Sequence, residues 1–147
     1  MKHVGVGVVP NDADATLADR YHEWAGHGGV LGGRRVSICS ARTDYRVGDE
    51  IRIVHAMEVI EPGHDVFVMG PKEVFDEYVD DVPCGDAGGI DDVDPFSPAE
   101  YDGRVAASPA VDTNFMTTVH TFMGPGDHEI SWRPGPLRSN VVRVRVV

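Results

Sequence analysis

Seven histidines provide the proton chemistry that this sequence can offer near neutral pH. His55 stands out because it falls in phase with Ile51 and Ile53 on a segment of alternating apolar residues. Such a residue points into a core, where its imidazole needs a hydrogen-bond partner. It is either a general base near the mouth of the sandwich or, as we favour, a satisfied core histidine or one at the exposed end of the strand. The seven are His3, His22, His27, His55, His64, His120 and His128.

His120 is the second candidate for acid–base chemistry. If the chain is an enzyme, we expect His55 or His120 to meet a carboxylate such as Glu77 or Asp112 and to transfer a proton with its help. His120 and His128 flank a turn, so they approach each other if a hairpin forms there. They stay apart if the two strands belong to different sheets.

No metal or cofactor site is expected. His22 and His27 are five residues apart, so they do not share a helix face as zinc-binding histidines do. The aspartates of residues 80–103 do not follow the spacing of a calcium loop. Cys39 and Cys84 lie in no Cys-x-x-Cys or Cys/His cluster, and we expect free thiols. The motifs of serine hydrolases, P-loop enzymes and Rossmann enzymes are also missing.

The net charge of the chain limits the kinds of partner that it can bind. With 24 acidic and 13 basic residues the formal net charge is −11, which repels nucleic acid and anionic membranes. No apolar run approaches the ~20 residues that span a bilayer, and residues 1–10 lack the features of a signal peptide. We therefore expect a cytoplasmic, soluble protein. Its partner, a protein or a small molecule, stays open, as does a homo-oligomer.

Most of the chain has the pattern of short strands. Residues 2–9 alternate valine with glycine, and from residue 35 onward the pattern is β. A short helix is expected between them, because apolar residues at helical spacing follow an aspartate and precede a glycine. Its residues are Asp12 or Asp14 at the cap, Leu17, Tyr21 and Trp24 on the apolar face, and Gly26 at the end. The further strands are expected at 36–41, 51–59, 65–69, 114–123, 128–132 and 140–147. A further segment at 73–79 has apolar residues available for packing.

These elements predict one mainly β domain over residues 1–147. About seven short strands with close turn signals indicate a two-sheet antiparallel β-sandwich. Residues 1–34 form an N-terminal elaboration of strand and helix. Residues 80–103 form a long acidic loop.

Two segments carry a resemblance to a known family. Residues 45–53 (YRVGDEIRI) and 125–132 (PGDHEISW) resemble the second and penultimate strands of bacterial immunoglobulin-like and fibronectin-III-like domains. The resemblance implies an immunoglobulin-like antiparallel β-sandwich, and in that family the position of His128 is often a tyrosine. It implies no particular activity, because such sandwiches host many functions.

Two functions remain open at this stage. The first is a stand-alone immunoglobulin-like binding or assembly module with an unknown partner. The alternative is a small cofactor-independent enzyme, a cyclase, isomerase or hydrolase of a small metabolite, that uses histidine and carboxylate acid–base chemistry. An enclosed pocket with an inward histidine and carboxylate favours the enzyme, and a flat apolar patch over a filled core favours the module.

Overall fold

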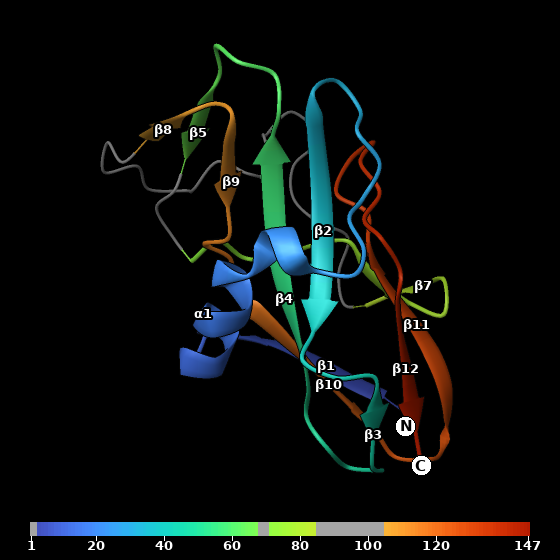
Figure 1. Cartoon of the computed structure of the whole chain (residues 1–147). Helices are drawn as coiled ribbons and strands as arrows, with labels where there is room; N and C mark the ends of the chain where they lie inside the picture. The colour runs from blue at the N-terminus through green and yellow to red at the C-terminus, as the bar shows by residue number, and fades with distance from the viewer. Residues whose placement is uncertain (1–2, 68–70, 85–104) are drawn as a thin grey trace.

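Two β-sheets packed against each other form the body of the protein. The computed structural model describes residues 3–67, 71–84 and 105–147 (Figure 1). The first sheet has the order β1 (His3–Val8), β10 (Thr117–Phe122), β4 (Ile51–Val59), β2 (Arg34–Ser40), with β9 (Ala110–Asp112) also on β4. The second has the order β3 (Asp44–Tyr45), β12 (Val142–Val146), β11 (Gly126–Trp132), β6 (Glu77–Val79), β7 (Val82–Pro83). β5 (Asp65–Phe67) and β8 (Val105–Ala107) form a separate ribbon.

The mainly β, two-sheet architecture expected from the sequence is confirmed within the described residues. Neighbouring strands pair antiparallel, with one exception: β3 lies parallel to β12. The chain alternates between the layers, since β2 and β4 belong to the first sheet and β3 to the second. β10 and β11 are consecutive in the chain but also lie in different sheets. His120 and His128 therefore do not form a hairpin pair.

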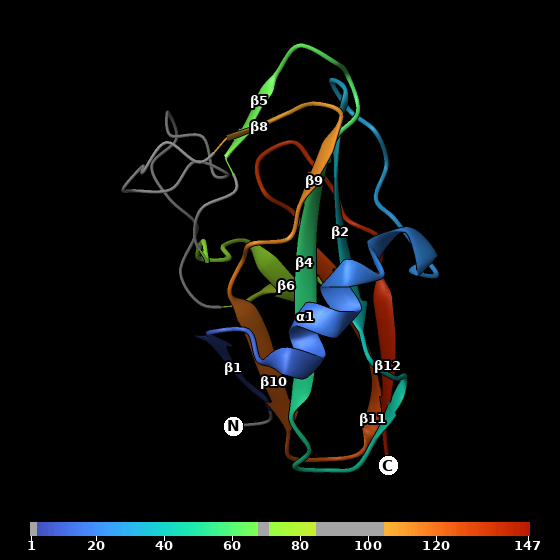
Figure 2. The same cartoon turned by 60° about the vertical axis from the view of Figure 1, so that its left-hand side comes forward.

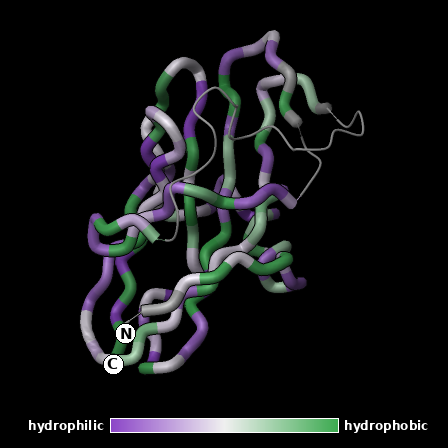
Figure 3. Tube along the Cα trace, turned by 180° about the vertical axis from the view of Figure 1, so that it is seen from behind, coloured by the Kyte–Doolittle hydropathy of each residue, from purple (hydrophilic) through white to green (hydrophobic). Residues whose placement is uncertain are grey.

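Alternation of side chains along β4 supplies much of the core. Ile51, Ile53, His55, Met57 and Val59 are all buried on the face that looks toward the second sheet. The second sheet packs large apolar residues of its own against this face. Figure 3 shows apolar and polar residues alternating along the strands. Each 100 Å² of apolar surface removed from water in this layer contributes about 2.5 kcal/mol. The residues that the second sheet contributes include Tyr45, Val79, Ile130, Trp132, Val144 and Val146.

The outer face of the first sheet is covered by α1 (Asp12–Asp19) and by the 3-10 turn that follows it, Tyr21–Glu23 (Figure 2). Val54 and Ala56 of β4 are buried under Tyr21 and Trp24 in a second, smaller apolar cluster. The middle of β4 is consequently buried on both faces, which explains why Val54 and Ala56 are apolar too.

The helix differs in both ends from the sequence expectation. Its N-cap is Asn11, whose side chain accepts the Asp14 N–H, while the Asp14 carboxylate accepts the Asn11 N–H in a capping box. The helix ends at Asp19 instead of running to Gly26. Trp24 Nε1 donates to the Leu17 carbonyl at 2.9 Å, so the aromatic side chain satisfies a carbonyl that another helical turn would have used.

Some strand boundaries also differ from the expected ones. In the segment expected to pack at 73–79, the strand β6 covers only Glu77–Val79. The strand expected at 114–123 starts only at Thr117, because residues 113–116 interrupt the pairing with β4 between β9 and β10, which lie along the same edge of β4. β5 covers residues 65–67 of the expected 65–69, and residues 68 and 69 lie outside the described residues. Residues 85–103 of the expected acidic loop lie outside the described residues.

Neither of the helical segments in the described part of the chain is long and apolar enough to cross a membrane.

Asp14 fixes α1 to the first sheet. Its carboxylate is buried and accepts hydrogen bonds from the Arg52 guanidinium at 2.8 Å and from Thr117 Oγ1 at 3.0 Å. Burial raises the pKa of Asp14, but Arg52, the Asn11 N–H and Thr117 outweigh it and hold that pKa below its ordinary value. One carboxylate thus connects a helix cap, β4 and β10.

We expect Asp14→Ala to lower the free energy of unfolding by about 2 kcal/mol, because it removes charge-assisted hydrogen bonds from a buried group. Urea unfolding followed by circular dichroism measures this, with the exposed Asp12→Ala on the same helix as control. Since folding lowers the pKa of Asp14, its contribution is complete above the unfolded pKa and is lost as the pH falls through the folded pKa. A variant that loses no more stability than Asp12→Ala at neutral pH would contradict this role.

Candidate active site

A carboxylate lies inside the sandwich, between the two sheets. Glu77 is 3% exposed and occupies the first position of β6, in register with Trp132 of β11. Glu77 and Val79 are buried in β6 while Tyr78 is only partly so, so strand alternation directs the Glu77 side chain toward the first sheet. A charge at this depth persists only if it is paired and hydrogen-bonded.

The partners of Glu77 come from the opposite sheet. His55 Nε2 of β4 lies 2.6 Å from Glu77 Oε2, and His120 Nε2 of β10 lies 2.5 Å from Glu77 Oε1. Thr118 Oγ1 donates a third hydrogen bond to Oε2 at 3.1 Å. Because each ring nitrogen must donate to the carboxylate, both imidazoles carry their proton on Nε2. We call His55, Glu77 and His120 the buried triad.

Burial on its own raises the pKa of Glu77. The electrostatic attraction and the hydrogen bonds of His55 and His120 outweigh that effect and hold the pKa of Glu77 well below its ordinary value. Glu77 is therefore a carboxylate at neutral pH, and the two imidazoles donate hydrogen bonds to it.

The two histidines have different surroundings. The His55 ring contacts the Trp132 ring edge to face, with centroids 4.9 Å apart, and its Nδ1 is buried without a hydrogen-bond partner among the described residues. His120 instead lines a cavity of about 240 Å³, together with Glu77 and Thr118. His55 thus contacts the carboxylate from inside the core, whereas His120 is the imidazole that borders the cavity.

Glycines in β1 provide the space for this cavity. Gly5 lies opposite His120 and Gly7 opposite Thr118 in the β1–β10 ladder, so side chains at 5 and 7 would be on the same face as the triad. Neither glycine has a positive φ. A Cβ on Gly7 would meet only the Met116 Cβ, at 4.0 Å. Among the described residues, position 7 therefore has room for a methyl group, and the two glycines border the cavity next to His120.

Cys84 lines the same cavity. Burial, followed by the negative charge of Glu77, raises the pKa of the Cys84 thiol to about 11. The thiolate is the nucleophilic form of cysteine, so Cys84 is not poised as a nucleophile at neutral pH. The cavity is suited to proton transfer and not to thiolate chemistry.

Asp112, the fourth residue proposed from the sequence, does not belong to the triad. Its Oδ2 lies 2.6 Å from Lys72 Nζ, and both side chains are almost completely buried. The Lys72 ammonium also lies over the Phe115 ring, 4.9 Å from its centroid. Burial raises the pKa of Asp112, and Lys72 and the Asn114 N–H only partly offset this.

The sequence-based candidates are thus brought together in part. His55, Glu77 and His120 converge, and each of the two histidines pairs with Glu77. Asp112 pairs with Lys72 instead. His128 lies in the second sheet with its Nδ1 2.7 Å from Asp80. Among the described residues no group of three or more His, Cys, Asp or Glu side chains is arranged to hold a metal ion.

Sequence reasoning missed three features of the site. Thr118 belongs to no recognisable motif, and its hydrogen bond to Glu77 depends on the register of β10. Lys72 could have been found as one of only two lysines in the chain, preceding an apolar segment. The alternation of Gly5 and Gly7 with valines predicted a strand, but which face the glycines occupied was unknown.

We expect Glu77→Gln to lower the free energy of unfolding at pH 7 by about 2 kcal/mol, because hydrogen bonds to a buried charge are weakened while the volume is kept. Because folding lowers the pKa of Glu77, its stabilisation is complete above the ordinary value of 4.5 and declines as the pH falls toward the folded pKa. The difference between wild type and variant should shrink in acid. Urea unfolding across this pH range measures it.

The exposed Glu73→Gln, on the segment leading into β6, is the matched control and should change little. A Glu77→Gln protein as stable as the wild type at neutral pH would show that the triad does not stabilise the ionised carboxylate.

Comparison with known proteins does not assign the chain to a family. No protein-family model matches the sequence, and no curated protein or solved structure is significantly similar to it. What the site can do therefore rests on its own residues and their contacts.

Proposed function

We propose that this protein is a small cofactor-independent enzyme that transfers protons on a small metabolite bound beside His120. The observation that carries the proposal is the cavity of about 240 Å³ lined jointly by Glu77, Thr118 and His120. Pockets for drug-sized ligands are about 300–1,000 Å³, so this one suits a smaller molecule. An isomerase, a cyclase or a hydrolase acting by general acid–base catalysis fits these residues.

Each residue has a separate role in this proposal. His120 exchanges the proton with the substrate. Glu77 holds the imidazole through Nε2 and stabilises the imidazolium formed when His120 takes a proton. His55 and Thr118 keep the carboxylate oriented, as positioning residues. Burial strengthens these electrostatic interactions, because few water dipoles compete with them.

The experiment uses a generic probe of proton abstraction: exchange of the α-hydrogens of hydroxyacetone in D2O, followed by 1H NMR. We expect the wild type to accelerate exchange over buffer and His120→Gln to reduce the enzyme-dependent rate about a hundredfold. His128→Gln, a histidine outside the cavity, is the control and should keep the rate.

Gly7→Val provides a test that leaves the triad intact. Its side chain should fill the cavity, abolish exchange and leave the fold unchanged, whereas Gly29→Val, in a loop with open space around it, should retain the rate. If the wild type does not accelerate exchange over buffer, catalysis on a carbon acid in this cavity is overturned. The same holds if Gly7→Val exchanges at the wild-type rate.

We propose further that the sandwich is immunoglobulin-like. The strand order supports this: β2-β4-β10 with β1 at the outer position corresponds to A-B-E-D, and β6-β11-β12 corresponds to C-F-G. The difference is the origin of the outer strand, since β1 precedes A in the chain. On this assignment the N-terminal elaboration supplies the strand that borders the cavity.

A cytoplasmic location is also part of the proposal. Cys39 and Cys84 are free thiols in the structure, and unpaired cysteines are usual in a reducing compartment.

A binding or assembly module is the second candidate, and the outer edge of β1 supports it. Among the described strands β1 pairs on one side only, with β10, and Val6 is 52% exposed. An open edge can pair with a strand of another chain. If two copies pair through this edge, sedimentation velocity should detect a dimer whose fraction increases with protein concentration. The Val6→Lys variant should remain monomeric. A monomer at every concentration would contradict self-assembly through this edge.

A further inference from the structure

Lys72 and Asp112 place an amine against a carboxyl group in the interior of the protein. Lys72 Nζ lies 2.6 Å from Asp112 Oδ2, and the two side chains are 3% and 1% exposed. The carboxyl carbon of Asp112 is one covalent bond beyond that oxygen, so a short approach brings the nitrogen to it. An amine and a carboxyl group held in contact are the two reactants of an amide bond.

Backbone pairing holds both reactants in place. The Lys72 N–H donates to the Asn114 carbonyl at 3.0 Å, and the Met116 N–H donates to the Lys72 carbonyl at 2.7 Å. Asp112 is the last residue of β9 and lies opposite Met57 of β4. The entropy of bringing the two groups together is therefore already lost on folding, and the effective concentration of the amine at the carboxyl group is high.

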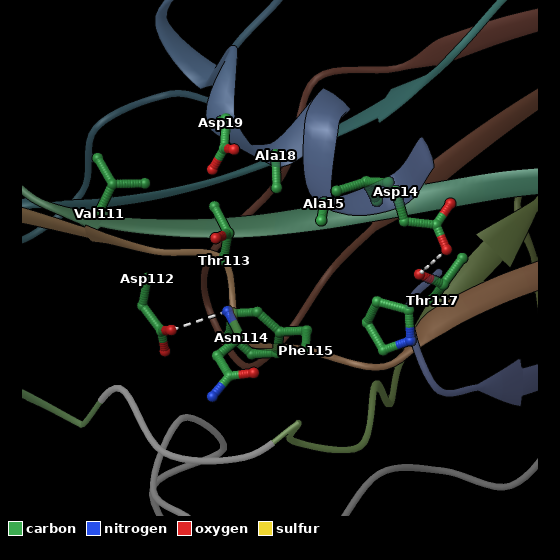
Figure 4. Close-up of a pocket in the computed structure, with 12 residues that line it drawn as sticks. Asp14, Ala15, Ala18, Asp19, Val111, Asp112, Thr113, Asn114, Phe115 and Thr117 are labelled. Atoms are coloured by element: carbon green, nitrogen blue, oxygen red, sulfur yellow. Dashed lines mark hydrogen bonds between the residues drawn. The ribbon is translucent and has the colours of Figure 1, made fainter. Parts of the chain in front are cut away.

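The two carboxyl oxygens of Asp112 have different surroundings. Oδ1 accepts the Asn114 N–H at 2.9 Å (Figure 4), whereas Oδ2 lies against the Lys72 amine. Attack on the carboxyl carbon puts negative charge on Oδ1, where this backbone N–H is already positioned to stabilise it. The contacts thus distinguish the oxygen that would be retained as an amide carbonyl from the oxygen that would leave as water.

Burial acts on the protonation of the pair, because an ammonium and a carboxylate lose the stabilisation of water inside a protein. It raises the pKa of Asp112, and Lys72 and the Asn114 N–H only partly offset this. Asp112 therefore takes up a proton more readily than an ordinary aspartate. The Phe115 ring beside Nζ favours the ammonium form, so the reactive molecules are those in which the proton has moved to Asp112.

We propose that Lys72 and Asp112 join in an intramolecular amide bond within the folded protein. A proton moves from Nζ to Oδ2, and the Nζ lone pair attacks Cγ, which places the negative charge on Oδ1. The Cγ–Oδ2 bond then breaks, and Oδ2 takes a second proton from Nζ and leaves as water. A C–N bond thus replaces a C–O bond, and the reaction needs no oxidant, reductant or further reactant.

The surroundings accommodate the product. Asp112 and Asn114 line a cavity of about 470 Å³ between α1 and the chain that connects β9 to β10, and this cavity can take up the released water. The new bond would enclose residues 73–111 in a covalent loop, which restricts the unfolded chain. The proposal is independent of proton transfer at His120.

Mass spectrometry of the intact wild type is the direct test. The protein is incubated at neutral pH and then unfolded in guanidinium chloride, so that an ion pair does not survive to the measurement. We expect a mass lower than that of the sequence by one water, and tandem spectra of a tryptic peptide in which Lys72 is joined to Asp112. A wild type that keeps the full mass would overturn the proposal.

Two variants locate the loss of water. Lys72→Arg keeps a positive charge but offers no free amine, because a guanidinium stays protonated, and it should keep the full mass. Lys2→Arg changes the only other lysine in the sequence and should lose water as the wild type does. Loss of water that persists in Lys72→Arg would identify a different reaction, such as succinimide formation, and would overturn the assignment. The tandem spectra of the wild type decide the site even if Lys72→Arg does not fold.

Discussion

The burial of the Glu77 charge between two β-sheets is the constraint on which the rest of the structure depends. An isolated carboxylate in an apolar layer would take up a proton or disrupt the packing. Here three donors from the opposite sheet meet its two oxygens. The alignment of β6 with β4 and β10 is therefore fixed by hydrogen bonds as well as by apolar packing. These hydrogen bonds join β6 to β4 and β10 in a defined direction, which apolar contacts alone do not impose.

The same constraint shapes the surroundings of the triad. Trp132 and Phe115 form an apolar wall with ring centroids 5.2 Å apart, and the wall keeps water from the His55 side. On the His120 side the wall is missing, because β1 presents glycines at positions 5 and 7. The buried triad is thus closed at one end and open at the other. In the proposed mechanism this asymmetry gives the two histidines different roles: His55 orients the Glu77 carboxylate, and His120 exchanges a proton.

Sequence patterns predicted the features that depend on local alternation. The inward direction of His55 followed from its phase with Ile51 and Ile53, and the bounds of β4 agree with the expected strand. The sequence suggested a pairing of His55 or His120 with Glu77 or Asp112. It did not predict that both histidines meet at Glu77, since that depends on which strands face each other across the sandwich. The Lys72 partner of Asp112 depends on a contact between segments that are far apart in sequence. The early end of α1 depends on Trp24 folding back onto the Leu17 carbonyl, which no propensity encodes.

Nuclear magnetic resonance of the imidazole rings tests the buried triad most directly. Long-range 1H–15N correlation of the native protein at neutral pH reports which ring nitrogen of each histidine carries the proton. The account predicts Nε2–H on both His55 and His120, with slowly exchanging ring protons far downfield, as expected for short hydrogen bonds to a carboxylate. Rings that exchange rapidly with water, or that carry their only proton on Nδ1, would contradict it.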